Sequence, residues 1–304
     1  MENNVQTCVA IVAPSGYAPD EAAYGRGLDR LRAAGCDIRE YYVPSLKHQR
    51  FGGCDEERVK QLHAAARDPD AQMVMAVRGG YGLSRILPAL DLDLLAACGK
   101  LFVGHSDFTA LHMALLARGA ASFAGPMVCI DYSRDDPSDF TLDHFWSCLK
   151  GPSHVIAFET PGGCALEAEG VLWGGNLTML THLIGTPWMP RVDGGILFLE
   201  DVNEHPYRIE RMLLQMLYAG LLDQKAIVLG DFSGGPLTSY DNGYGIDAML
   251  TYLRERIGVP ILAGLPFGHI RDKATLAVGS RARLVCDGRA ATLEMRGYKS
   301  LATC

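Results

Sequence analysis

The sequence lacks the features that mark several common classes of protein. Its lysines and arginines are scattered and never form a run, and the formal net charge is -7, so the chain has no mark of a nucleic-acid-binding protein. The nine cysteines are an odd number and include no C-x-x-C pair, which predicts reduced thiols and neither a zinc knuckle nor a disulfide framework. Neither G-x-G-x-x-G nor G-x-x-x-x-G-K is present, so nucleotide-phosphate binding has no specific support.

Long apolar runs are absent as well. No uninterrupted apolar segment reaches the roughly 20 residues that a membrane-spanning helix needs. The first residues, MENNVQTCVAIVAPSG, contain no Lys or Arg, and Pro14 and Gly16 interrupt a short apolar run. This pattern does not predict a secretory signal peptide. We therefore expect a soluble, cytoplasmic protein whose partners include neither nucleic acid nor a membrane.

The first half of the sequence alternates between buried strands and helices. The segments CVAIVA, AQMVMAV and LFVG have the composition of apolar strands, and EAAYGRGLDRLRAAG and DEERVKQLHAAARDP have helical spacing. This alternation is typical of a parallel sheet covered on both faces. After Lys150, short extended pieces broken by Gly and Pro replace it, and further strands and helices lead to a β-rich tail.

The length of 304 residues favours two domains over one. The change of pattern after Lys150 predicts an N-terminal α/β domain over residues 1–150. A linker is expected over 151–165, and a C-terminal domain over 166–304.

The segment GHSD places His105, Ser106 and Asp107 side by side. Consecutive side chains on an extended chain point to opposite faces, so these neighbours cannot form a triad with one another. A tight turn from the strand LFVG into the next helix would raise the Ser106 hydroxyl above the sheet and direct the Asp107 N–H into the same space, as in a nucleophile elbow. The alternative is an ordinary helix N-cap at Ser106, since the second Gly of G-x-S-x-G is missing.

Two other strand ends could complete such a site, because ligands bind at the carboxyl ends of parallel strands. Gly79 and Gly80 of RGGYG could offer N–H groups to an oxyanion, or could simply form a turn. Glu200 ends the strand GILFLE, where a buried carboxylate needs a partner. A structural pair between Glu200 and Arg208 or Arg211 is the alternative interpretation.

Among nine histidines, His269 is the best candidate for a general base. It lies in a loop rich in Pro and Gly after the strand PILAG, and such loops commonly carry function. His105, His112 and His182 remain alternatives, although each is more often a structural histidine than a base.

The segments APSG, RGGYG, GHSDFTAL, EGVLWGGNLTML, LEDVNEHPYRIERML and PFGH occur in that order. Over essentially the full chain, this series resembles the LD-carboxypeptidase family of serine peptidases. The resemblance implies that Ser106 is the nucleophile, Glu200 the acid and His269 the base of a triad. It also implies that the backbone N–H groups of Asp107 and Gly80 form the oxyanion hole.

The resemblance further implies an α/β fold with an N-terminal parallel-sheet domain and a C-terminal β-rich, barrel-like domain. The active site would lie at the domain junction, and the protein would be a homodimer. The implied reaction removes the terminal D-alanine from peptidoglycan tetrapeptides in cell-wall recycling. The scissile bond would join the L-centre of meso-diaminopimelate, or L-lysine, to D-alanine, and no metal or organic cofactor is implied.

Five residues are candidates for binding the muropeptide substrate. Arg78 and Arg211 could bind the carboxylate of the D-alanine, because each carries a cationic group near a motif of the site. Trp173, Asn176 and Glu204 could line the pocket, with core packing and a helix-terminal charge as the alternatives.

Two other functions stay open. A peptidase of the microcin C self-immunity type, which acts on aminoacyl or peptidyl adenylates, would have the same triad with an additional insertion that holds the nucleotide; no long extra segment is seen. A non-catalytic muropeptide-binding protein could use the same scaffold. The presence of Ser106, Glu200 and His269 together argues against that second alternative.

Overall fold

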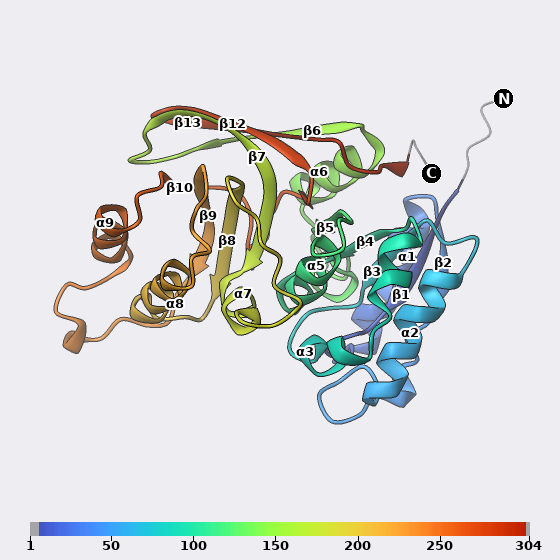
Figure 1. Ribbon diagram of the computed structural model, residues 1–304. Coiled ribbons are helices and arrows are strands. Elements are labelled where there is room, and N and C mark those ends of the chain that lie inside the picture. Colours follow the sequence, from blue (N-terminus) through green and yellow to red (C-terminus); the bar gives the residue numbers. More distant parts are fainter. Residues whose placement is uncertain (1–5, 302–304) are drawn as a thin grey trace.

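The computed structural model describes residues 6–301, which form two sheets with helices packed on them (Figure 1). The first sheet has the order β11-β5-β4-β3-β1-β2. Its strands are β1 (Thr7–Val12), β2 (Cys36–Glu40), β3 (Met73–Ala76), β4 (Leu101–Gly104), β5 (Ser122–Ala124) and β11 (Leu276–Val278). Strands β1 to β5 run parallel, and β11 joins the edge antiparallel to β5. The expected parallel-sheet α/β architecture of the N-terminal half is confirmed.

The central strands of the first sheet are buried because helices cover them. Every residue of β3 and β4 is buried, as is typical of parallel strands without a solvent-facing side. The main helices of this half are α1 (Glu21–Ala33), α2 (Asp55–Arg67), α3 (Leu83–Ile86), α4 (Leu92–Ala97), α5 (Thr109–Leu116) and α6 (Asp139–Lys150). Helix α5 is buried from Thr109 to Leu115, so the segment behind Ser106 belongs to the core.

The second sheet has the order β10-β9-β8-β7-β12-β13-β6. Its strands are β6 (Ser153–Glu159), β7 (Ala165–Asn176), β8 (Ile196–Val202), β9 (Ala226–Ser233), β10 (Ile261–Ala263), β12 (Arg281–Asp287) and β13 (Ala290–Arg296). Strands β7 to β10 are parallel, whereas β12, β13 and β6 continue from β7 in antiparallel pairs.

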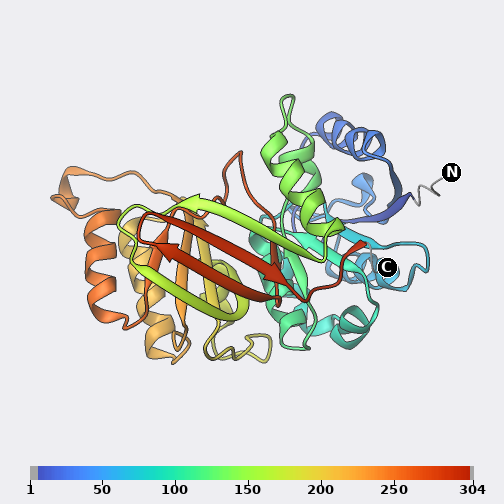
Figure 2. The same ribbon diagram turned by 90° about the horizontal axis from the view of Figure 1, so that it is seen from above.

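Strand β7 is long enough to belong to both halves of this sheet, and the antiparallel half bends over the parallel half (Figures 1 and 2). The two edges approach each other: a Cβ at Gly264, just after β10, would lie 2.1 Å from the carbonyl oxygen of Glu159 at the end of β6. This bending gives the β-rich, barrel-like form expected of the C-terminal half.

Helices α7 (Leu177–Leu183), α8 (Pro206–Tyr218) and α9 (Ile246–Arg256) flank the parallel half of the second sheet (Figure 1). Helix α5 of the first half contacts both α7 and β7. The junction between the two halves is therefore formed directly behind Ser106, by the helix that follows it.

Two strands cross the expected domain limits. Strand β6 lies inside residues 151–165, the range expected to be a linker, and pairs with β13. Strand β11 comes from the C-terminal half of the sequence but pairs with β5 of the first sheet. The boundaries 1–150, 151–165 and 166–304 remain a prediction.

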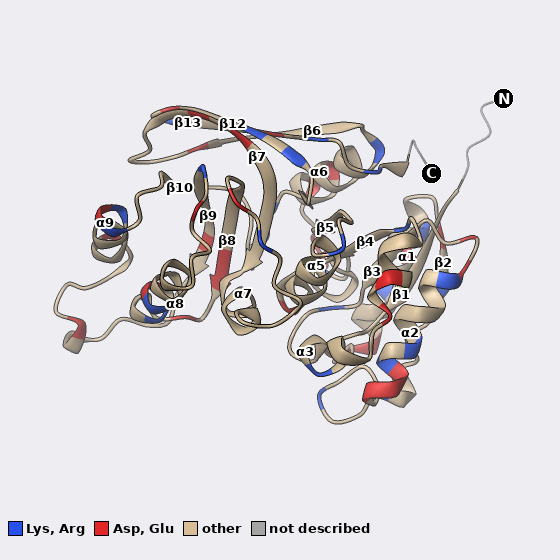
Figure 3. Ribbon diagram, in the orientation of Figure 1, with Lys and Arg blue, Asp and Glu red and all other residues tan. Residues whose placement is uncertain are grey.

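Acidic and basic residues are interspersed over both halves of the molecule (Figure 3). Within residues 6–301, no helix combines the length and the apolar character needed to cross a membrane.

Candidate active site

Ser106 lies on a sharp turn at the carboxyl end of β4. It is the first residue of a short 3-10 helix, Ser106–Phe108, which leads into α5. Its φ of 65° is in the left-handed region, which is uncommon for a residue with a side chain. The turn has the geometry of a nucleophile elbow. Ser106 is not the N-cap of this 3-10 helix; that position is occupied by His105, without a side-chain cap hydrogen bond.

The glycine turn RGGYG lies directly against Ser106. A Cβ at Gly79 would be 2.8 Å from the Ser106 Cβ, so a larger residue would displace the serine. Gly80 is exposed and has a φ of 107°. The close approach requires glycine at position 79, and it keeps the backbone of this turn beside the serine hydroxyl.

The structure brings Ser106, His269 and Glu200 into one hydrogen-bonded chain. His269 Nε2 lies 3.1 Å from Ser106 Oγ, and His269 Nδ1 lies 2.7 Å from Glu200 Oε2. A neutral imidazole can accept from the serine O–H at Nε2 while donating from Nδ1–H to the carboxylate. Ser106 comes from the first half of the molecule, whereas Glu200 lies near the carboxyl end of β8 and His269 follows β10.

Glu200 is fully buried and is oriented by Asn176. The Asn176 side chain donates from Nδ2 to Glu200 Oε1 at 3.1 Å and to Asp201 Oδ1 at 3.0 Å. Asp201 in turn accepts from both the N–H and the hydroxyl of Thr178 at the start of α7. Among residues 6–301, Glu200 forms no pair with Arg208 or Arg211; the structural alternative for this carboxylate is therefore wrong.

The Asp107 side chain joins three motifs on the nucleophile side. Its Oδ2 accepts from Ser15 Oγ at 2.6 Å and from the Leu83 N–H at 2.9 Å. Ser15 belongs to APSG, and Leu83 directly follows RGGYG, so one carboxylate connects both loops to GHSD. Burial raises the pKa of Asp107, and its hydrogen bonds oppose that shift. The sequence pointed only to the backbone N–H of Asp107; the signal for its side chain is that all three motifs follow strands of one sheet.

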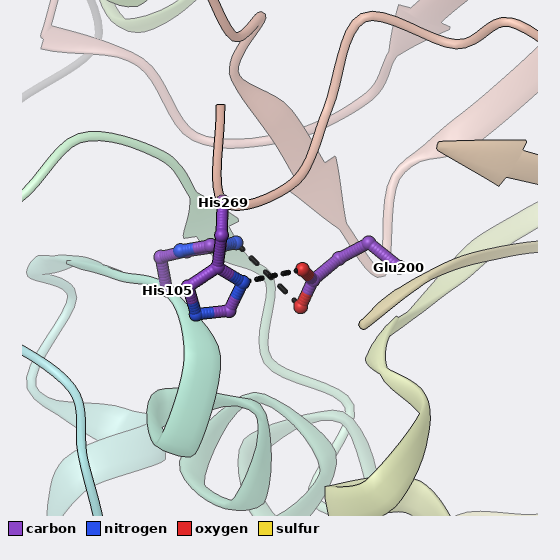
Figure 4. Close-up of side chains that lie close together, drawn as sticks. All are labelled: His105, Glu200 and His269. Atoms are coloured by element: carbon purple, nitrogen blue, oxygen red, sulfur yellow. Dashed lines mark hydrogen bonds and ion pairs between the residues drawn. The ribbon is translucent and has the colours of Figure 1, made fainter. Parts of the chain in front are cut away.

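His105 is a second imidazole next to the Glu200 carboxylate (Figure 4). Its side chain is 2% exposed, and its Nε2 lies 3.6 Å from Glu200 Oε1. The ring centroid is 4.5 Å from that of His269 and 5.2 Å from that of Phe267. Burial, followed by the nearby charge of Lys273, holds the pKa of His105 well below its usual range, so this imidazole is neutral at physiological pH.

The loop that carries His269 is anchored to the first half of the molecule. Lys273 Nζ lies 2.9 Å from Asp131 Oδ1, and both side chains are buried. Asp131 belongs to a π-helical turn, Val128–Tyr132. The Lys273 N–H also donates to Thr141 Oγ1 on α6 at 2.9 Å. The position of the imidazole therefore depends on contacts across the junction.

The two candidate arginines differ in their surroundings. Arg78 is half-buried next to the glycine turn, and within the described part of the chain it forms no ion pair. Its Nε would lie 3.4 Å from a Cβ at Gly16, so it is in the loop cluster beside Ser106. Arg211 is exposed on α8, with its guanidinium 6.0 Å from the ring of Tyr207.

The candidate pocket residues are not brought together. Trp173 is fully buried, and its Nε1 donates to Gln224 Oε1 at 3.0 Å, so it packs in the core of the second half and does not line a solvent-accessible pocket. Glu204 lies 3.5 Å from Arg208 one helical turn away, as expected of a helix-terminal charge. Asn176 contacts the Glu200 carboxylate, as described above.

The chain is similar in sequence and fold to known proteins. Residues 9–125 match the family model described as the LD-carboxypeptidase N-terminal domain, and residues 169–284 match the LD-carboxypeptidase C-terminal domain. The crystal structure of muramoyltetrapeptide carboxypeptidase from Oxalobacter formigenes is 49% identical, with a TM-score of 0.94 over 97% of this chain and 100% of that chain.

More distant relatives extend the comparison. The murein tetrapeptide carboxypeptidase of Pseudomonas aeruginosa is 30% identical over 91% of this chain and 92% of its own length. The microcin C7 self-immunity protein in its wild-type state has a TM-score of 0.87 at 23% identity, over 97% of this chain and 98% of that chain. At that identity the likeness concerns the fold alone.

Proposed function

The chain belongs to the LD-carboxypeptidase family, and from this premise we propose that it is a serine LD-carboxypeptidase that releases the terminal D-alanine of peptidoglycan tetrapeptides. The bond cleaved would join the L-centre of meso-diaminopimelate, or L-lysine, to D-alanine. The observation that carries this proposal is the hydrogen-bonded chain from Ser106 through His269 to Glu200, with separations of 3.1 and 2.7 Å.

In the proposed reaction, Ser106 Oγ attacks the scissile carbonyl carbon as His269 Nε2 takes its proton. The C–N bond then breaks, and D-alanine leaves with a proton from the imidazolium. Water, activated by the same imidazole, releases the tripeptide from the acyl-enzyme. Glu200 fixes the imidazole with its proton on Nδ1 and stabilises the imidazolium charge.

The N–H groups of Asp107 and Gly80 are assigned as the hydrogen-bond donors to the negative oxygen of the tetrahedral intermediate. The left-handed φ of Ser106 and the glycine contact beside it support this assignment. For the carboxylate of D-alanine, Arg78 is the better candidate, because its guanidinium has no acidic partner in the described chain and a free guanidinium can bind a carboxylate in a bidentate manner. Arg211 is the weaker candidate, since it is exposed on α8.

The test is mass spectrometry of the tetrapeptide L-Ala-D-Glu-meso-diaminopimelate-D-Ala after incubation with the purified protein in EDTA. We expect loss of one alanine by the wild type and an intact peptide with Ser106→Ala. Cleavage that survives the substitution would overturn the assignment of the nucleophile.

The second candidate function is that of a microcin-type peptidase, because a microcin C7 self-immunity protein is also related in sequence, with 27% identity over 87% of this chain. An aminoacyl-sulfamoyl adenosine is the matched substrate for that alternative. If it is cleaved faster than the tetrapeptide, the microcin-type activity replaces our proposal. Tetrapeptide binding that is unchanged by Ser106→Ala, without any turnover, would instead identify a muropeptide-binding protein.

We propose in addition that the protein acts in cell-wall recycling in the cytoplasm and is a homodimer. The role in recycling and the dimer rest on the family relationship. Sedimentation equilibrium of the purified protein tests the dimer: a single species with the mass of one chain would remove it.

A further inference from the structure

One buried polar atom near the proposed triad has no hydrogen-bond partner. His105 Nε2 is shielded from solvent and makes no hydrogen bond in the described chain. A buried polar atom without a partner is destabilising. The atom nonetheless points toward Glu200 Oε1 at 3.6 Å, from the same side as His269 (Figure 4).

Three potential metal ligands meet at this point. Single ligand atoms of His105, Glu200 and His269 all lie within 4.8 Å of one another. Two imidazoles and one carboxylate are a common ligand set for Zn²⁺, with metal–ligand distances of about 2.0–2.2 Å. Two ligand atoms on one tetrahedral ion are then about 3.4 Å apart. The 3.6 Å separation between His105 Nε2 and Glu200 Oε1 is close to that value.

We propose that His105, Glu200 and His269 form a binding site for a divalent transition-metal ion such as Zn²⁺, which inhibits the enzyme. The ion would bind His105 Nε2, a Glu200 oxygen and His269 Nδ1, with water at the fourth position. It would take the place of the Nδ1 proton that now joins His269 to Glu200 at 2.7 Å. The neutral imidazole then carries its proton on Nε2, the nitrogen that faces Ser106, and the Nδ1 and Glu200 oxygen atoms move apart to admit the ion.

Inhibition follows from the same contacts. A His269 imidazole that is held by the metal at Nδ1 no longer donates to Glu200, and Glu200 can no longer stabilise a positive charge on that ring. The ion is therefore an inhibitor of the proposed triad and not its cofactor. Metal binding is independent of the proposed function, whereas inhibition rests on it.

The chain offers an internal control for binding by other histidines. His144 Nδ1 and His154 Nε2 lie 2.8 Å apart on α6 and β6, and this pair also presents two imidazoles to a metal. Unlike His105, both are only partly buried, and within residues 6–301 no carboxylate forms a metal-ligand cluster with them. His154→Asn therefore tests whether a surface pair accounts for any zinc that binds.

The binding experiment is titration of the full-length protein with Zn²⁺ by calorimetry and by competition with a chromogenic chelator. We expect one ion to bind wild type, Ser106→Ala and His154→Asn with the same affinity. His105→Phe and Glu200→Gln should weaken binding by about tenfold or more. Equal affinity in wild type and His105→Phe, or no binding by wild type, would overturn the proposal, as would loss of binding in His154→Asn.

Thermal unfolding followed by circular dichroism checks that His105→Phe is folded. If it is not, His105→Gln, which keeps a polar side chain but no imidazole, replaces it in the titration. In the tetrapeptide assay, Zn²⁺ should inhibit wild type reversibly, with EDTA restoring activity. For each histidine variant, we measure the zinc concentration that halves that variant's own metal-free rate. This concentration is then compared with the wild-type value. A His105 variant as sensitive as wild type contradicts the site, whereas no activity in any protein contradicts only the proposed function.

Discussion

The two sides of the candidate site are built in different ways. On the nucleophile side, Ser106 and Asp107 follow a strand of the first sheet, and Asp107 bonds directly to Ser15 and to Leu83. On the opposite side, Glu200 lies near the carboxyl end of β8, and His269 follows β10, another strand of the second sheet. The loop of His269 is fixed by contacts of Lys273 with the first half. The nucleophile side is thus complete within one half of the molecule, whereas the acid–base side depends on how the halves are joined.

The largest effect is expected from Glu200→Gln, which changes the acid–base side without changing its shape. A glutamine amide no longer provides the negative charge that stabilises the imidazolium and selects its tautomer. We expect kcat for tetrapeptide cleavage to fall by about 10³- to 10⁴-fold, with little change in KM. Steady-state kinetics on a protein with an unchanged circular dichroism spectrum checks this. A loss of less than tenfold would show that this side does not depend on the carboxylate.

Breaking the buried ion pair between Lys273 and Asp131, which joins the two halves, should give the next largest effect. Lys273→Met leaves Asp131 charged and unpaired in the interior, which we expect to lower the free energy of unfolding by about 3–5 kcal/mol. The double variant Lys273→Met with Asp131→Leu removes both buried charges and should recover most of that loss. Urea denaturation measures both variants. If the double variant is as unstable as the single one, the ion pair is not what joins the His269 loop to the first half.

Acidification should weaken the nucleophile side through its buried histidines. His112 is held between Ser122 and the Gly104 carbonyl, and burial lowers its pKa to about 4. Because the unfolded chain takes up this proton near pH 6.5, the stabilisation is complete above that pH and is lost as the pH falls toward 4. The expected loss is about 3 kcal/mol.

The measurement is the free energy of unfolding at several pH values for wild type and His112→Gln. Between pH 6.5 and 4, the free energy of unfolding of the variant should depend less steeply on pH than that of the wild type, because the contribution of His112 is missing. Parallel curves for the two proteins would contradict a neutral, buried His112.

The same contrast explains how far the sequence could predict the structure. The fold class followed from local patterns, since β3 and β4 are apolar throughout and α5 has no polar face. Ser106, Glu200 and His269 were recognised because each lies at or just after the carboxyl end of a strand, although their assignment as a triad needed the family resemblance. Their roles as nucleophile, acid and base remain predictions.

What the sequence could not predict depends on how the halves join. The pairing of β11 with the first sheet and the ion pair between Lys273 and Asp131 link residues that are far apart in the chain. The approach of His105 to Glu200 is of the same kind. Trp173 was misjudged for a related reason, because a tryptophan at a strand end can face either the pocket or the core, and only packing decides which.

The smallest effect is expected from Ser15→Ala on the nucleophile side. It removes one hydrogen bond to Asp107 but leaves the Leu83 N–H bonded to the same oxygen. We expect a loss of about 1–2 kcal/mol of stability and a decrease in kcat without a change in KM. The reason is that APSG, whose Gly16 N–H donates to the Gly79 carbonyl oxygen at 3.1 Å, becomes less firmly held. Asn176→Ala is the matched change on the acid–base side, since it removes one hydrogen bond to Glu200. If the nucleophile side is the self-contained one, Ser15→Ala should lower kcat less than Asn176→Ala does, and the reverse order in steady-state kinetics would contradict that difference between the two sides.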